Sequence, residues 1–177
     1  MYKWLILYSS VTGNTRKIAA EIASASGGEL VSIDNLPKDL SSYDIVAVGY
    51  WLWRGGPDPK TREILPQLQD KTIVLFQTQG TEPGSEHSVT ALARAAYLLG
   101  KNCDILGTFS AQGKINPALI AKRKKAPADG FHTGAEAQKR WQRAAGHPDA
   151  EDLKNARLFV AQMERKLSAK RKFAARQ

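Results

Sequence analysis

Apolar runs of strand length alternate with segments of helical period along residues 1–112. Strands that alternate with helices form parallel sheets joined by crossover connections, so this pattern predicts a doubly wound α/β domain. The predicted helices are Asn14–Ser26, Lys60–Gln69 and Gly84–Leu99. The predicted strands, five in all, are Lys3–Tyr8, Glu29–Ile33, Asp44–Gly49, Thr72–Gln77 and Cys103–Ala111.

The pattern changes after residue 112. Residues 116–125 have the composition of a short basic helix, and residues 126–148 are polar and interrupted by Gly and Pro. Asp149 has the residue type and position of an N-cap for a closing helix. We therefore expect one domain over residues 1–168, with 113–148 as a basic, polar excursion and 169–177 as a disordered basic tail. The closing helix has one apolar stripe: Leu153, Ala156, Phe159, Val160, Met163 and Leu167.

A loop of small and hydroxylated residues joins the first predicted strand directly to the first predicted helix. The unpaired N–H groups and the dipole of a helix N-terminus attract anions, and hydroxyl groups add further donors. Gly13 permits a close backbone approach. The pattern indicates a phosphate site, and the alternative is a turn that only caps the helix. The candidate residues are Ser9, Ser10, Val11, Thr12, Gly13, Asn14 and Thr15.

Two common phosphate loops do not match this segment. A nucleoside triphosphatase loop requires Gly-Lys-Ser/Thr where this chain has Gly13-Asn14-Thr15, and a dinucleotide loop requires three spaced glycines. A terminal monophosphate is the better ligand. Ser10 to Thr15 resembles the Ser/Thr-x-Thr-Gly-x-Thr signature with which flavodoxins bind the phosphate of FMN.

The resemblance to flavodoxins implies a five-stranded parallel sheet of order 2-1-3-4-5, with FMN bound at the carboxyl ends of the strands. It also implies that the loop after the third strand stacks an aromatic ring on the flavin and turns a flexible carbonyl toward it. The loop after the fourth strand would contact the pyrimidine edge. The corresponding residues are Tyr50, Trp51, Leu52, Trp53, Gly55 and Gly56 in the first loop, and Thr78, Gln79, Gly80 and Thr81 in the second.

The chain departs from flavodoxins in two ways. Its second flavin loop has no aromatic residue, so one face of the ring is expected to be open. Ordinary flavodoxins are acidic, whereas this chain has a net charge of +9. Residues 1–112 contain 10 Lys and Arg against 11 Asp and Glu, a net of −1, and residues 113–177 contain 16 against 6, a net of +10. The basic third favours an acidic partner or an anionic substrate, with peripheral membrane contact left open.

Several other classes of function are disfavoured. No apolar run is long enough to span a membrane, and the first residues lack a signal-peptide pattern. Cys103 is the only cysteine, which favours a reducing cytoplasm. His87, His132 and His147 lie far apart without ligand-type companions, so we expect no metal site. No nucleic-acid-binding module accompanies the basic charge, so we expect no nucleic acid partner.

Three functions are consistent with these features. The first is an FMN-binding electron-transfer protein that passes electrons to a partner reductase and needs no catalytic proton-transfer residue. The second is an FMN-dependent oxidoreductase acting on a quinone-like or tetrapyrrole substrate, similar to the bacterial protoporphyrinogen dehydrogenases. The third is a flavin-free adaptor that kept the fold. An intact phosphate loop and two loop tryptophans, Trp51 and Trp53, disfavour the adaptor.

Overall fold

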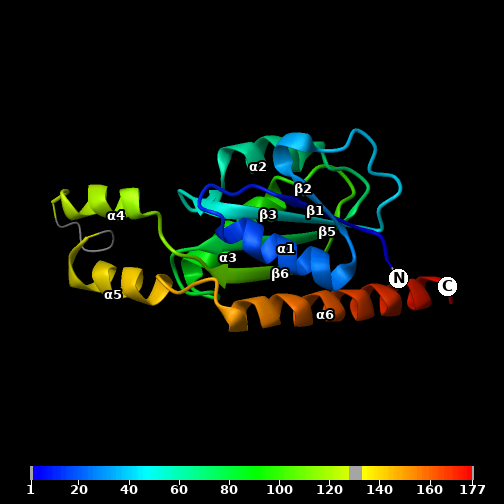
Figure 1. Ribbon diagram of the computed structural model, residues 1–177. Helices are drawn as coiled ribbons and strands as arrows, with labels where there is room; N and C mark the ends of the chain where they lie inside the picture. The colour runs from blue at the N-terminus through cyan, green and yellow to red at the C-terminus, as the bar shows by residue number, and fades with distance from the viewer. Residues whose placement is uncertain (1, 128–132, 177) are drawn as a thin grey trace.

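The computed structural model describes residues 2–127 and 133–176 and contains a central parallel sheet with helices on both faces (Figure 1). The strands follow the order β2-β1-β3-β5-β6, which is the predicted order once the short β4 is left out. All neighbours along this path are parallel. The strands of the path are β1 (Trp4–Tyr8), β2 (Glu29–Ser32), β3 (Ile45–Trp53), β5 (Thr72–Gln79) and β6 (Asp104–Gln112).

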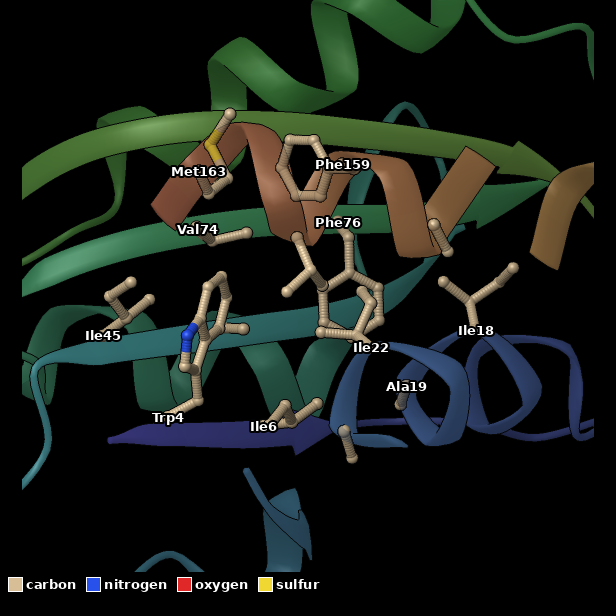
Figure 2. Close-up of a cluster of buried hydrophobic side chains, with 14 of the residues drawn as sticks. Trp4, Ile6, Ile18, Ala19, Ile22, Ile45, Val74, Phe76, Phe159 and Met163 are labelled. Carbon is tan, nitrogen blue, oxygen red and sulfur yellow. The ribbon is translucent and has the colours of Figure 1, made fainter. Parts of the chain in front are cut away.

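Alternate residues of each strand enter two separate cores, because successive side chains point to opposite faces of a sheet. On β1, Trp4 and Ile6 join the core beneath α1 (Asn14–Ser26) and α6 (Ala150–Ala174), which Figure 2 shows. Leu5 and Leu7 join the core on the other face. That second face is covered by α2 (Pro59–Ile64), the short 3-10 helix η2 (Leu65–Gln67) and α3 (Glu86–Tyr97). A further short 3-10 helix, η1 (Ile33–Asn35), follows β2.

The strand β3 is longer than its apolar run predicted. The aromatic segment after Gly49, which we expected to be a loop, continues the strand to Trp53 and pairs with β5 as far as Trp51 and Thr78. A tight hairpin then returns the chain as β4 (Gly56–Pro57), antiparallel to β3. Arg54 and Gly55 at its tip both have positive φ, as a type I′ turn requires.

The excursion contains two helices, α4 (Pro117–Lys124) and α5 (Gly134–Ala144). The structure confirms the short basic helix but corrects the expectation of an irregular segment up to residue 148. Buried Ala137, Trp141 and Ala144 form the apolar stripe of α5. Both helices project beyond the carboxyl ends of the strands (Figure 1). We call residues 114–127 and 133–147 the arm.

The last helix continues through most of the segment that we expected to be a disordered tail, and ends at Ala174. Basic residues of its last turns reach two strand ends: Lys170 forms an ion pair with Asp104, and Arg171 contacts Asp44 at 2.7 Å. Asp149 caps the helix through a capping box with Asp152, and the six residues of the predicted stripe face the sheet core. Among the described residues, no helix combines the length and apolar character needed to cross a membrane.

Candidate functional site

A cavity of about 430 Å³ opens at the carboxyl ends of the central strands. This volume falls in the range of about 300–1,000 Å³ that is typical of small-molecule sites. Its walls come from the loop before α1, the end of β3, the end of β5 and the arm. Of the predicted site residues, those that line it are Val11, Thr12, Asn14, Trp51, Leu52, Trp53, Thr78, Gln79, Gly80 and Thr81.

The loop before α1 has the geometry of an anion cradle. Gly13 sits at φ +89° as the N-cap residue, and α1 has no side-chain cap, so its first-turn N–H groups are left for a ligand. The Gly13 N–H donates to Ser10 Oγ at 3.1 Å. Asn14 Nδ2 donates to Thr12 Oγ1 at 3.1 Å and to the Lys114 carbonyl at 2.9 Å. These contacts tie the loop both to itself and to the arm.

Two of the predicted phosphate contacts also have partners within the protein. The buried Thr15 hydroxyl lies 2.8 Å from Thr78 Oγ1, which joins α1 to the end of β5. Ser9 Oγ donates at 2.9 Å to buried Asp58, whose carboxylate also accepts from the backbone N–H and hydroxyl of Thr61. The side chain of Ser9 therefore anchors α2, and a cofactor contact of Ser9 through its backbone stays a prediction.

The end of β3 divides its aromatic residues between the two faces of the sheet. Trp51 and Trp53 are partly exposed and line the cavity, whereas Tyr50 is fully buried in the second core. Burial raises the pKa of the Tyr50 hydroxyl, and the ring lies on the face of the sheet opposite Trp51, so only the backbone of Tyr50 is left for the predicted flavin contact. Arg54 and Arg62 lie over the Trp53 ring at 4.8 and 5.4 Å from its centroid. Trp51 is therefore the better stacking candidate.

The two glycines assigned to a flexible carbonyl are fixed in the β3–β4 hairpin. Both are buried and lie outside the cavity lining. The Gly55 carbonyl accepts a hydrogen bond from Arg94 Nη1 at 2.9 Å. An added Cβ at Gly56 would meet Arg62 Nη2 at 2.9 Å. The Gly55 carbonyl is therefore less free to turn than we expected, and a cofactor contact of Gly55 and Gly56 stays a prediction.

The wall at the end of β5 carries polar atoms that lack partners. Gln79 Oε1 and Thr81 Oγ1 are buried and form no hydrogen bond within the described residues. A buried polar atom without a partner costs about 1–3 kcal/mol, so a ligand that hydrogen-bonds here would relieve that cost. Next to them, Ile115 packs on Gly80, where an added Cβ would lie 2.6 Å from Ile115 Cγ1. An aliphatic side chain of the arm thus lies beside the loop that lacks an aromatic residue.

These features fit FMN. The cradle before α1 suits its phosphate, and Trp51 supplies an aromatic wall. The unpaired Gln79 oxygen suits the single N–H donor of the pyrimidine edge, and the Thr81 hydroxyl suits one of its carbonyls. The pattern of the sequence missed the cavity residues that the arm and α3 contribute, because their spacing along the chain gives no sign of the fold that brings them together. They are His87, Lys114, Ile115, Asn116, Leu119, Arg123 and Arg140; Gly113, which lies between β6 and the arm, also lines the cavity.

His147 has two acidic neighbours at the start of α6. His147, Asp149 and Asp152 place their ligand-type atoms within 4.8 Å of one another, although the sequence suggested no companions for His147. His147 Nδ1 lies 2.5 Å from Asp152 Oδ2, and both carboxylates accept backbone N–H groups at the start of α6. The cluster is explained by the helix cap. His132 lies outside the described residues.

Comparisons with known proteins agree with this geometry. A model of the flavodoxin domain family matches residues 5–161. The chain is 33% identical over 174 residues to the flavodoxin-like domain-containing protein BilS of Clostridioides difficile (strain CD3), covering 94% of this chain and 98% of that one. It is 24% identical over 188 residues to BilS of Clostridium symbiosum (strain WAL-14163), covering 89% and 94%.

Solved structures share the fold at low identity. The flavodoxin, WrbA-like protein from Agrobacterium tumefaciens has a TM-score of 0.61 at 16% identity, covering 95% of this chain and 99% of that one. A flavoprotein in complex with FMN from Lactobacillus acidophilus NCFM has a TM-score of 0.53 at 19% identity, covering 62% and 93%. The sheet order, the loop before α1 and the family match together identify this chain as a member of the flavodoxin domain family.

Proposed function

We propose that this protein binds FMN without a covalent bond and carries electrons to a partner reductase. The observation that carries the proposal is the cavity itself, in which an uncapped helix N-terminus, a stacking tryptophan and unpaired buried oxygens converge. Bound FMN supplies reversible one- and two-electron chemistry, which no amino-acid side chain in the cavity supplies. Membership of the flavodoxin domain family supports the same cofactor.

The chain's own residues bind and orient the cofactor. Ser10, Thr12 and the N–H groups at Gly13 and the first turn of α1 hold the phosphate, and Trp51 packs on the ring system. At the polar edge the Gln79 oxygen accepts a hydrogen bond, and the Thr81 hydroxyl donates one to a carbonyl. Because the described residues that line the cavity include no Asp or Glu, a carboxylate general acid is absent from this part of the wall. Electron transfer does not need one.

The proposal extends to a redox partner protein and to the cytoplasm as the location. A redox partner protein must approach the cavity mouth, where the arm lies. The described Cys103 is a free thiol whose Sγ–H donates to the Leu68 carbonyl, and burial raises its pKa. A structural thiol of this kind suits the reducing cytoplasm, which we propose as the location.

A specific observation favours a second candidate, an FMN-dependent oxidoreductase with a quinone-like or tetrapyrrole substrate. Lys114, Arg123 and Arg140 line the same cavity and would attract an anionic substrate. A dithionite titration of the FMN complex, followed by its visible spectrum, separates the two candidates. Two resolved one-electron steps support the carrier, and a single two-electron step supports the oxidoreductase. A protein that stays colourless with added FMN contradicts both and leaves the adaptor.

A further inference from the structure

We propose that the arm builds a second subsite in the flavin cavity, which binds a small, planar anion through Arg123 and Arg140. The inference rests on the proposed function, because it assigns the space beside a bound flavin. It adds a substrate class, an aromatic carboxylate or sulfonate, and two residues that recognise it. Neither residue belongs to the three loops that hold the cofactor.

The cavity has two parts of different origin. The phosphate loop and the ends of β3 and β5 form one part, which fits FMN. The other part comes from the arm: Ile115 and Asn116 lead into α4, while α4 and α5 contribute Leu119, Arg123 and Arg140. Figure 1 shows both helices beyond the strand ends, away from the layers that cover the sheet. The second part therefore comes from segments that do not pack on the sheet.

One face of α4 points into the cavity. Leu119 and Arg123 are four residues apart, so they lie on the same side of the helix, and both line the cavity wall. α4 has no buried residue, and Leu119 is 39% exposed. An eight-residue helix is marginal on its own, so this face gains stability from a ligand that packs on Leu119. An apolar side chain beside a guanidinium suits a flat aromatic group that carries an anion.

The arm adds cationic side chains to the cavity wall beside the phosphate loop. Lys114 lies next to the phosphate loop, because its carbonyl accepts the hydrogen bond from Asn14 Nδ2, and the dipole of α1 adds positive potential there. Arg123 and Arg140 belong to the helices of the arm. Arginine binds carboxylate and sulfonate groups in a two-pronged geometry, which makes it the better residue for a planar anion than lysine.

A small molecule fits these two arginines better than an acidic protein does, because they line a concave wall. The cations that would meet a protein surface are the exposed ones on the outer sides of the same helices. Lys124 and Lys139 are exposed and absent from the cavity lining. Replacing these two lysines is a matched control, because it removes the same charge from the same two helices as replacing the two arginines.

The test uses calorimetry on the oxidised, FMN-saturated protein with two probes, anthraquinone sulfonate and the uncharged anthraquinone sulfonamide. We expect the wild-type protein to bind the sulfonate at least about tenfold more tightly than the sulfonamide. The variant Arg123→Gln/Arg140→Gln should lose this preference and still bind the sulfonamide. The control Lys124→Gln/Lys139→Gln should keep it.

Three results would contradict the proposed anion subsite. They are equal binding of both probes to the wild-type protein, an equal loss in the control variant, and a weaker FMN affinity in the arginine variant with the sulfonate preference intact. The last result would assign the arginines to the phosphate. FMN binding is measured first by quenching of flavin fluorescence. If FMN does not bind, the proposed function fails, and the same titrations of the apoprotein then decide the anion subsite separately.

Discussion

The pair of hydroxyls at Thr12 and Thr15 offers a test in which ligand binding and folding respond separately. Thr12 is exposed at the cavity, whereas Thr15 is buried and its hydroxyl pairs with Thr78 at 2.8 Å. Thr12→Val removes a donor to the phosphate and no buried contact. We expect FMN binding to weaken by about 1.5–2 kcal/mol, or about 10- to 30-fold, with the free energy of unfolding of the apoprotein unchanged.

Valine has nearly the same shape as threonine, but the variant Thr15→Val leaves the buried Thr78 hydroxyl without its Thr15 partner. The free energy of unfolding of the apoprotein should fall by about 1–2 kcal/mol. In the double variant Thr15→Val/Thr78→Val neither hydroxyl is left behind, so its destabilisation should be smaller than the sum of the single effects by about 1 kcal/mol. Urea unfolding measures stability, and quenching of FMN fluorescence measures affinity. Additive destabilisation, or a Thr12 variant that loses stability and keeps its FMN affinity, would refute this assignment of roles.

Three further changes test other parts of the site and fold. Trp51→Ala should weaken FMN binding by about tenfold and Trp53→Ala by less, because two guanidinium groups already lie over the Trp53 ring; equal effects in a fluorescence titration would contradict this. Gly55→Ala should lower apoprotein stability in urea by about 1–2 kcal/mol, because φ is +77° there. The hydrogen bond from the Lys3 N–H holds the pKa of Asp44 below its usual range. The stability lost in Asp44→Asn should therefore be largest above the usual range of an Asp and vanish as the pH falls through the lowered pKa in acid unfolding.

The sequence predicted best where local signals agree. The bounds of α1 match the prediction because glycines with positive φ flank it, Gly13 before and Gly27 after. The layout of the proposed phosphate loop was predicted for the same reason, since a strand, a hydroxylated turn and a helix follow one another directly. The capping box at Asp149 was also readable, because its residues are neighbours in the chain.

The errors lie where distant contacts decide the structure. Glycines after Trp53 made the end of β3 read as a loop, but pairing with β5 and β4 extends the strand through it. The basic residues after Ser168 read as a solvated tail, yet Asp44 and Asp104 at the strand ends hold them in α6. The helix α5 has few apolar residues, and its Trp141 is buried only because the chain returns to the domain.

The arm shows the same limit at the functional site. Leu119, Arg123 and Arg140 carry no motif, and their place in the cavity follows from contacts between remote segments. The Lys114 N–H donates to the His147 carbonyl at 2.8 Å, which brings the two ends of the arm together. Arg143 forms an ion pair with Glu82 at 2.8 Å, which joins α5 to the loop after β5. Such contacts arise only once the sheet is assembled.

The most direct test of the account compares the affinity of the apoprotein for FMN and for riboflavin, which differ only by the phosphate. If the loop from Ser10 to Thr15 is the phosphate site, FMN should bind about 100-fold more tightly or better, and high salt should reduce the difference. Equal affinity for the two flavins would contradict the central claim, because the cavity would then hold a flavin without using the loop.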